Sequence, residues 1–290
     1  MKVICADTAG FCFGVERAVK TVYDALASGE EKIYTYGPII HNETVVNELA
    51  EKGVSIISSP GELEQLEKGC VIIRSHGVTK EIYEIIEKKG LKYIDATCPF
   101  VLKIHKLVDE ASKKGEYVVV AGDRLHPEVE GILSFAKDDV TVVKDAAEAE
   151  AFKPPEDKKI LLVSQTTFNS YIFNKIVEIF DKKRYYYNAV YTICNATALR
   201  QQETAELAAK VDAMIVIGGA HSSNTRKLYD IAKDSCDNTI YVQTLDDLVS
   251  SKNAICDPAS CVGITAGAST PKNIIEEVQN YVRRFWTDVG

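Results

Sequence analysis

The chain has 290 residues, 46% hydrophobic and 26% charged, and this composition excludes a largely disordered protein. Lys and Arg number 34 against 42 Asp and Glu, so the net charge is −8, which argues against non-specific nucleic-acid binding. No apolar run is long enough for a transmembrane helix and no signal peptide is visible, so we expect a cytoplasmic protein without a membrane partner. The eight cysteines are then expected to be reduced thiols or metal ligands.

Short β-branched runs alternate with amphipathic stretches along the chain, a pattern typical of α/β folds with parallel sheets. Most of these runs are continuously apolar, as expected for strands buried on both faces. Strands are predicted over 2–7, 32–37, 70–77, 117–123, 159–165, 214–219, 239–243 and 261–267. A helix is predicted over 15–28, where apolar residues recur at helical spacing. The polar stretch 153–159 is too short to separate free domains.

Three landmarks repeat with a period near 90 residues. Cysteines precede expected helices at Cys12, Cys98 and Cys194, which are separated by 86 and 96 residues. A histidine ends the next strand in each case, namely His41, His126 and His221. A later strand ends in a polar loop containing His76, Thr166 or Ser269. The repeat predicts three α/β modules over 1–97 (including the N-terminal strand), 98–193 and 194–290.

The cysteines indicate a metal centre because open parallel sheets bind ligands at the carboxyl ends of their strands. A helix N-terminus favours the thiolate form of cysteine, and soft sulfur ligands select zinc or iron–sulfur chemistry. Three protein ligands leave one metal position open. Buried cysteines can also be small hydrophobic residues, and we favour this for the remaining five: Cys5, Cys70, Cys236, Cys256 and Cys261. Cys256 and Cys261 form a C-x₄-C pair that could alternatively hold a metal.

Glu128 and His126 are the best acid–base candidates, because a buried carboxylic acid can protonate a departing hydroxyl. The alternative is that Pro127 and Glu128 simply begin a helix. Likewise, the residues Asn42, Ser222, Ser223 and Asn224 could be N-caps or an anion site. Neither a G-x-G-x-x-G nor a G-x-x-x-x-G-K-[ST] motif occurs, so a nicotinamide, flavin or ATP site is not indicated. Reducing power, if needed, would come from outside.

Nine motifs between Ala9 and Asn273 carry a family resemblance. They are GFCFGVERAV, GPIIHN, RSHGV, DATCPFVLKIH, HPEVEG, SQTT, CNATALRQ, GGAHSSNTRKL and TAGAST. In this order they resemble the 4-hydroxy-3-methylbut-2-enyl diphosphate reductases, the last enzymes of the methylerythritol phosphate route to isoprenoids. The resemblance implies three α/β modules in a pseudo-threefold cloverleaf around one 4Fe–4S cluster. Cys12, Cys98 and Cys194 would hold this cluster and leave its apical iron open.

The resemblance also implies residue roles in the reductive removal of an allylic hydroxyl group. The substrate diphosphate would be bound by His41, His76, His126, Ser222, Ser223, Asn224 and Ser269. Glu128, with Thr166 beside it and His126 nearby, would deliver the proton, and an external donor such as ferredoxin or flavodoxin would supply electrons. His221, Leu102 and Asn195 differ from the residues that are commonest in the family at these positions, but none is a proposed ligand or acid. An iron–sulfur dehydratase and a non-catalytic iron–sulfur sensor or electron carrier are the alternatives.

Overall fold

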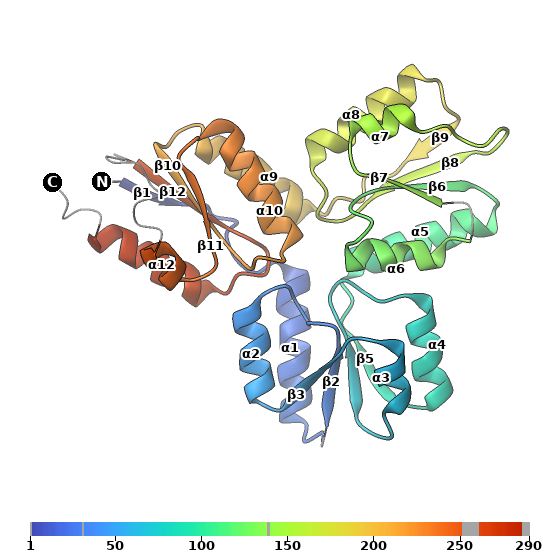
Figure 1. Ribbon diagram of the computed structural model, residues 1–290, viewed down its shortest axis with the longest axis horizontal. Helices are drawn as coiled ribbons and strands as arrows, with labels where there is room; N and C mark the ends of the chain where they lie inside the picture. The colour runs from blue at the N-terminus through green and yellow to red at the C-terminus, as the bar shows by residue number, and fades with distance from the viewer. Residues whose placement is uncertain (1, 31, 138–139, 251–260, 286–290) are drawn as a thin grey trace. The chain divides into compact units, whose positions relative to one another are not determined.

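The computed structural model describes residues 2–30, 32–137, 140–250 and 261–285 (Figure 1). Its contacts divide the chain into two compact units. The smaller unit contains residues 1–15, 41–47 and 195–290, and the larger contains 16–40 and 48–194. The described strands form three four-stranded parallel sheets flanked by helices, which confirms the predicted α/β fold with three sheets. Cys256 lies outside the described residues.

The first sheet belongs to the larger unit and has the strand order β3-β2-β4-β5. Its strands are β2 (Ile33–Tyr36), β3 (Val54–Ile57), β4 (Cys70–Ile73) and β5 (Lys92–Asp95). The helices are α1 (Phe13–Ala27), α2 (Glu43–Glu51), α3 (Pro60–Gln65) and α4 (Lys80–Lys89). All four residues of β4 are buried, because helices cover both faces of this central strand.

The second sheet also belongs to the larger unit and has the order β7-β6-β8-β9. Its strands are β6 (Tyr117–Ala121), β7 (Val140–Val143), β8 (Ile160–Ser164) and β9 (Tyr187–Ala189). Helices α5 (Pro99–Lys113) and α6 (Pro127–Phe135) pack on one face through a core that includes Ile104 and Ile132. Helices α7 (Ala146–Ala151) and α8 (Ser170–Lys182) pack on the other through Phe173 and Phe180.

The third sheet forms the smaller unit and has the order β1-β12-β10-β11. Its strands are β1 (Lys2–Cys5), β10 (Ala213–Ile217), β11 (Thr239–Val242) and β12 (Cys261–Ala266). Helices α9 (Asn195–Ala208) and α10 (Ser223–Ser235) cover one face. Helices α11 (Leu245–Ser250) and α12 (Lys272–Phe285) cover the other.

The N-terminal strand was expected in the first module, and this expectation is wrong. Lys2 to Cys5 of β1 pair in parallel with Cys261 to Ile264 of β12, in the third sheet. Residues 194–290 contribute only three described strands to that sheet, whereas residues 32–97 supply all four strands of the first. The fourth strand of the third sheet therefore comes from the other end of the chain.

Four strands were not predicted, namely β3, β5, β7 and β9. All four lie at sheet edges, where the neighbouring side is open and side chains are partly exposed. Edge strands are often short and polar, because exposed apolar edges promote aggregation. These segments therefore lack the continuous apolar run that marks the central strands.

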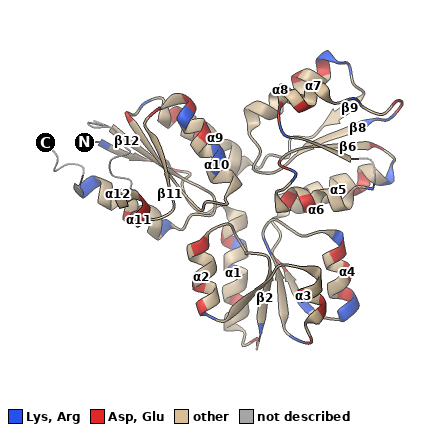
Figure 2. Ribbon diagram, in the orientation of Figure 1, with Lys and Arg blue, Asp and Glu red and all other residues tan. Residues whose placement is uncertain are grey.

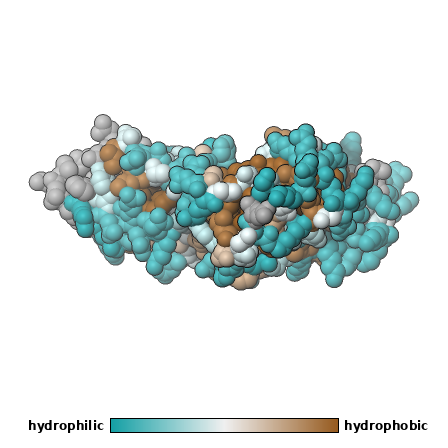
Figure 3. All heavy atoms as spheres, turned by 90° about the horizontal axis from the view of Figure 1, so that it is seen from below, coloured by the Kyte–Doolittle hydropathy of each residue, from teal (hydrophilic) through white to brown (hydrophobic). Residues whose placement is uncertain are grey.

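Charged residues gather on the outward faces and ends of the helices, whereas the sheets contain few of them (Figure 2). On the face shown in Figure 3, hydrophilic side chains cover most of the described surface, with hydrophobic residues between them. Among the described helices, none has the length and apolar character that crossing a membrane requires.

Candidate functional site

Each of the three predicted cysteine ligands lies in the loop after an edge strand of one sheet and directly before a helix. Each backbone N–H also donates to a carbonyl in the loop after the adjacent, paired strand. These hydrogen bonds run from Cys12 to Ala268 at 3.2 Å, from Cys98 to Ser75 at 2.9 Å and from Cys194 to Thr166 at 3.1 Å. The thiol-bearing residues are half-buried in all three cases. The cysteines therefore occupy equivalent positions at the carboxyl ends of three equivalent sheets.

Glu128 is a buried carboxyl group on the first turn of α6, with a side chain that is 1% exposed. The Thr166 N–H donates to its Oε1 at 2.6 Å, and the Thr166 hydroxyl donates to its Oε2 at 2.7 Å. Burial raises the pKa of Glu128 to about 7, although both hydrogen bonds from Thr166 oppose the shift. The group can therefore hold a proton at neutral pH and release it, which is what a general acid requires.

His126 is the N-cap of α6, and its Nδ1 accepts a hydrogen bond from the Glu128 N–H at 3.1 Å. The neutral ring must then carry its proton on Nε2, which becomes a donor. The His76 ring, from the loop after β4, meets the His126 ring edge-on with centroids 5.4 Å apart. The larger unit thus brings together four predicted site residues: His76, His126, Glu128 and Thr166.

In the smaller unit, the loop after β10 leads into α10 with Ser222 as the N-cap. The Ser222 hydroxyl accepts from the Thr225 N–H at 3.2 Å, so the predicted capping role is confirmed for this residue. Asn224 is also buried, but in the described part of the chain neither its Oδ1 nor its Nδ2 has a hydrogen-bond partner. Because buried amides are normally paired, Asn224 indicates a polar ligand at this helix N-terminus.

The same unit places the loop after β2 against the loops that follow β10 and β12. The Ser269 hydroxyl donates to the His41 carbonyl at 3.1 Å. A Cβ added to Gly219 would lie 2.6 Å from that carbonyl oxygen, so only glycine permits this approach. Asn42 caps α2 by accepting from the Val45 N–H at 3.1 Å, whereas His221 is exposed. Cys12, His41, Asn224 and Ser269 therefore belong to one polar region of the third sheet.

Sequence reasoning missed side chains that hold the cysteine loops, above all Arg17, Arg200 and Glu203. Arg200 is buried in α9 and donates to the backbone of the segment before Cys12. A usable signal was present, because the buried face of α9 includes the polar residues Thr197, Arg200, Gln201 and Thr204 at helical spacing. A polar face on a helix that packs against a sheet requires hydrogen-bond partners.

The donor sets fit two kinds of group. Three equivalent half-buried thiols suit an iron–sulfur cluster, because thiolate is the protein ligand that such clusters use. Phosphate oxygens suit the Asn224 amide, which has no hydrogen-bond partner among the described residues. They also suit the serine-rich N-terminus of α10 and the Nε2 donor of His126.

Comparison with known proteins agrees with these features. A relative from Caldanaerobacter subterraneus subsp. tengcongensis, named 4-hydroxy-3-methylbut-2-enyl diphosphate reductase, is 44% identical over 283 residues, or 96% of this chain and 95% of the relative. A relative of the same name from Aquifex aeolicus is 42% identical over 98% of this chain and 96% of its own length.

Solved structures give the same result. The E-1-hydroxy-2-methyl-but-2-enyl-4-diphosphate reductase of Plasmodium falciparum superposes with a TM-score of 0.90 at 29% identity, covering 98% of this chain and 89% of that one. A structure of (E)-4-hydroxy-3-methyl-but-2-enyl diphosphate reductase gives 0.66 at 41% identity, covering 98% and 100%. The model of the LytB protein family matches residues 3–283, and the chain therefore belongs to that family.

Proposed function

We propose that the protein is an oxidoreductase that converts (E)-4-hydroxy-3-methylbut-2-enyl diphosphate into isopentenyl and dimethylallyl diphosphate. The allylic carbon–oxygen bond breaks, two electrons enter from an external donor, and two protons are taken up. One proton leaves with the hydroxyl group as water, and the other adds to carbon at either end of the allylic unit. The names of the relatives support this reaction.

The observation that carries the proposal is the buried pair of Glu128 and Thr166. The pKa of Glu128, raised to about 7 by burial, lets the carboxyl group hold a proton until the hydroxyl group departs. The hydrogen bond of 2.7 Å to the Thr166 hydroxyl can reverse direction when the acid is protonated, so Thr166 can pass the proton on. A non-catalytic electron carrier would have no use for such an acid.

The diphosphate would be bound by hydroxyl, amide and imidazole donors. Asn224 offers a buried amide that has no hydrogen-bond partner in the described ranges, and Ser222 and Ser223 lie at the N-terminus of the 13-residue helix α10. His41, His76, His126 and Ser269 complete the proposed set, with His126 donating through Nε2. These neutral groups can receive an anion without a surrounding cluster of lysines.

The proposed cofactor is one 4Fe–4S cluster per chain, held by Cys12, Cys98 and Cys194. Such a cluster, when bound, supplies electrons one at a time and offers a Lewis-acid position that no protein ligand occupies. The support is the equivalent placement of the three cysteines, each with its N–H bonded to the neighbouring loop. We propose ferredoxin or flavodoxin as the external electron donor.

Replacement of Glu128 tests the proton-delivery role. Glu128→Gln should retain the iron and sulfide content of the wild type and lose at least about 100-fold in kcat, because a positioned general acid contributes about that much. The matched control is Glu130→Gln, which removes an exposed carboxyl group two residues along the same helix. Turnover of the Glu128 variant close to that of the control would remove Glu128 from this role.

Replacement of a proposed ligand tests the cofactor. After anaerobic purification, Cys98→Ser should lose most of its iron and sulfide, whereas Cys5→Ser, which alters a thiol in β1, should keep both. Full cluster retention in the Cys98 variant, or no cluster in the wild type, would overturn the assignment.

A further inference from the structure

Two side chains of α9 hold the backbone that leads into Cys12. Glu203 accepts from the Asp7 N–H at 2.7 Å through Oε1, and from the Thr8 N–H at 2.9 Å through Oε2. The Thr8 hydroxyl donates to the same Oε2. Arg200 donates from Nε to the Thr8 carbonyl at 2.8 Å and from Nη2 to the Gly10 carbonyl at 2.7 Å. Both the N–H groups and the carbonyl groups of this loop are thereby bound to one helix.

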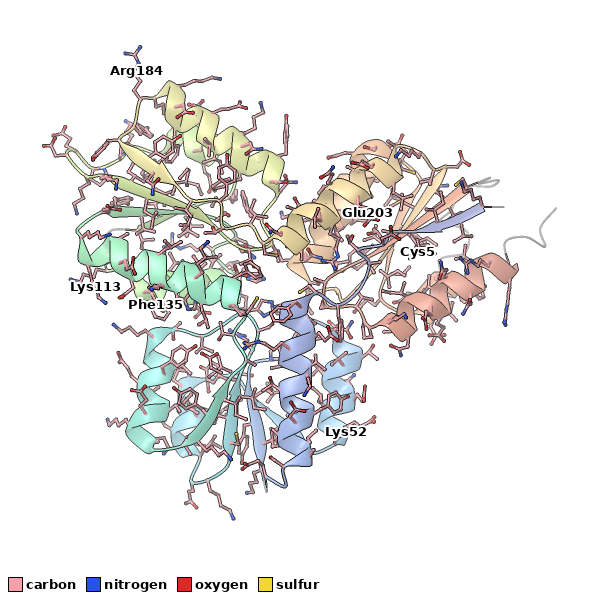
Figure 4. All side chains as sticks on the ribbon, turned by 180° about the vertical axis from the view of Figure 1, so that it is seen from behind. Cys5, Lys52, Lys113, Phe135, Arg184 and Glu203 are labelled. Atoms are coloured by element: carbon pink, nitrogen blue, oxygen red, sulfur yellow. The ribbon has the colours of Figure 1, made fainter. Side chains whose placement is uncertain are left out.

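Arg200 and Glu203 are both charged, and both bind the backbone of this loop. Arg200 is 3% exposed, and burying a guanidinium group is unfavourable unless its donors are bonded. Burial opposes ionisation of Glu203, but the hydrogen bonds from Thr8 and Asp7 and the charge of Arg200 together hold its pKa below the ordinary value. Figure 4 shows Glu203 on α9 beside Cys5 at the end of β1, where this loop begins.

A second arginine does the same in the larger unit. Arg17 of α1 donates from Nη2 to the carbonyl of Thr97, the residue directly before Cys98. Thr97 is fully buried, and its N–H donates to Asp95 Oδ1 at 2.8 Å. The backbone before Cys98 is therefore fixed from both directions.

The two arginines follow one rule. Arg17 lies five residues after Cys12 and holds the segment before Cys98, while Arg200 lies six residues after Cys194 and holds the segment before Cys12. Before Cys194 the same task falls to Thr192, whose hydroxyl accepts from the Ser164 N–H at 2.7 Å and donates to the Ser164 carbonyl at 2.6 Å. A helix that follows one cysteine thus secures the approach to another in two of the three cases.

We propose that Arg17 and Arg200 are positioning residues that preorganise the segments carrying Cys98 and Cys12 for cluster binding. This inference rests on the proposed function. A loop that must be ordered during binding costs conformational entropy, which weakens the hold on the bound group. Gly10, at a φ of 102°, makes the first loop intrinsically adaptable, so the side-chain hydrogen bonds have to fix it.

The test uses the full chain with methionine or lysine in place of each arginine. Methionine removes every donor, whereas lysine retains the charge but cannot reproduce the two-pronged bond of Arg200. Gln202→Ala is the matched control in α9, since Gln202 is exposed and bonds only outward to Glu206 among the interactions described. Lys20→Ala is the control in α1, where Lys20 pairs with Asp24 on the exposed face.

Two quantities are measured. In the cluster-free chain, amide hydrogen exchange over residues 7–12 should be at least about tenfold faster in Arg200→Met than in wild type. Exchange over 96–98 should be accelerated by the same factor in Arg17→Met. Exchange in the central strands β4 and β12 should be the same as in wild type. In the loaded enzyme, bleaching of the cluster absorbance by a chelator should be accelerated by a similar factor. The lysine variants should fall between methionine and wild type, and both controls should stay within twofold of wild type.

Each outcome decides the matter. Accelerated exchange confined to the named segments together with faster cluster loss supports the proposal. Unchanged amide exchange overturns the proposal, and so does faster exchange combined with cluster loss at the wild-type rate. The proposal also fails if Arg17→Lys is as impaired as Arg17→Met. If the wild type itself holds no cluster, the proposed function fails. If the wild type holds a cluster and the arginine variants lose theirs no faster, only the positioning role fails.

Discussion

Glu128 is held between two opposing influences at the scale of a single residue. Removal from water favours its neutral form, while the N–H and hydroxyl of Thr166 favour the carboxylate. Because desolvation is the larger influence, the pKa lies at about 7 in the folded chain against 4.5 for the ordinary group. The folded state therefore binds a proton more tightly at this position than the unfolded state does.

This difference predicts the pH dependence of stability. The protonated group contributes about 3 kcal/mol to the free energy of unfolding below pH 4.5. This contribution is lost as the pH rises through 7. Glu128→Gln cannot ionise, so its free energy of unfolding relative to wild type should increase from pH 4 to pH 8 by roughly that amount. Urea unfolding at both pH values measures it, with the exposed Glu130→Gln as the control. A pH-independent difference between Glu128→Gln and wild type would contradict the prediction.

His105 is a buried imidazole outside the proposed mechanism. It is 3% exposed, and within the described residues neither ring nitrogen has a hydrogen-bond partner. Its ring stacks on Phe135 of α6 with centroids 4.4 Å apart, and a Cβ on Gly77 would lie 2.9 Å from its Cε1. Burial lowers the pKa of His105 to about 4, although the charge of Asp95 opposes this shift. The ring is therefore neutral at physiological pH and acts by its shape.

Replacing His105 by another planar ring should preserve the fold. His105→Phe retains the stack on Phe135 and removes an unsatisfied polar group, so its stability at pH 7 should equal or exceed that of wild type by about 1 kcal/mol. In wild type, stability falls as the pH drops from 6.5 through 4, because the unfolded imidazole binds the proton more tightly. The variant should lose this part of the acid sensitivity, whereas His221→Asn, at an exposed position, should not. Destabilisation by several kcal/mol at pH 7 would show that the nitrogens are needed.

At the scale of elements, the candidate site depends on turns that follow strands. The turn after β10 contains Gly218 and Gly219, and the second of these allows the His41 loop to approach closely. The neighbouring Thr270 hydroxyl donates to the Ile217 carbonyl at 3.0 Å, which ties the turn after β12 to the end of β10. The positions of His41 and Ser269 are thus set by backbone packing between loops.

Gly219→Ala should disturb this packing. The added Cβ would lie 2.6 Å from a backbone oxygen that cannot rotate away, so the free energy of unfolding should fall by about 1–3 kcal/mol. Displacement of the His41 loop should also raise KM for the diphosphate substrate more than it lowers kcat. Gly61→Ala is the matched control, because nothing lies within 4 Å of its added Cβ and alanine is favoured in α3. Equal behaviour of the two variants in denaturation and kinetics would refute the packing argument.

At the scale of the whole molecule, the net charge of −8 and an anionic substrate are compatible. The charged side chains lie mainly on the outward faces of helices (Figure 2), while the proposed diphosphate donors are neutral side chains and a helix N-terminus. Exposed charges are screened over about 8 Å at physiological salt, so the local donors decide binding.

The sequence by itself determined the features that have a local signature. Central strands appear as apolar runs, and Cys12, Cys98 and Cys194 could be placed at strand–helix junctions because each strand and helix has its own periodicity. The polar segments that contain His126, Glu128 and Thr166 could also be placed after apolar strands, because that is a local pattern, whereas the roles proposed for Glu128 and Thr166 rest on the family resemblance.

Only the tertiary structure decided what depends on contacts between distant segments. Three features have no local sequence pattern that predicts them. They are the pairing of β1 with β12, the burial that raises the pKa of Glu128, and the hydrogen bond from the Asp7 N–H to Glu203, which lies 196 residues further along the chain. The four edge strands β3, β5, β7 and β9 were missed for the same reason, since their pairing compensates for weak local preferences. A single sequence encodes local preference directly, but burial and long-range hydrogen bonds exist only once the chain has folded.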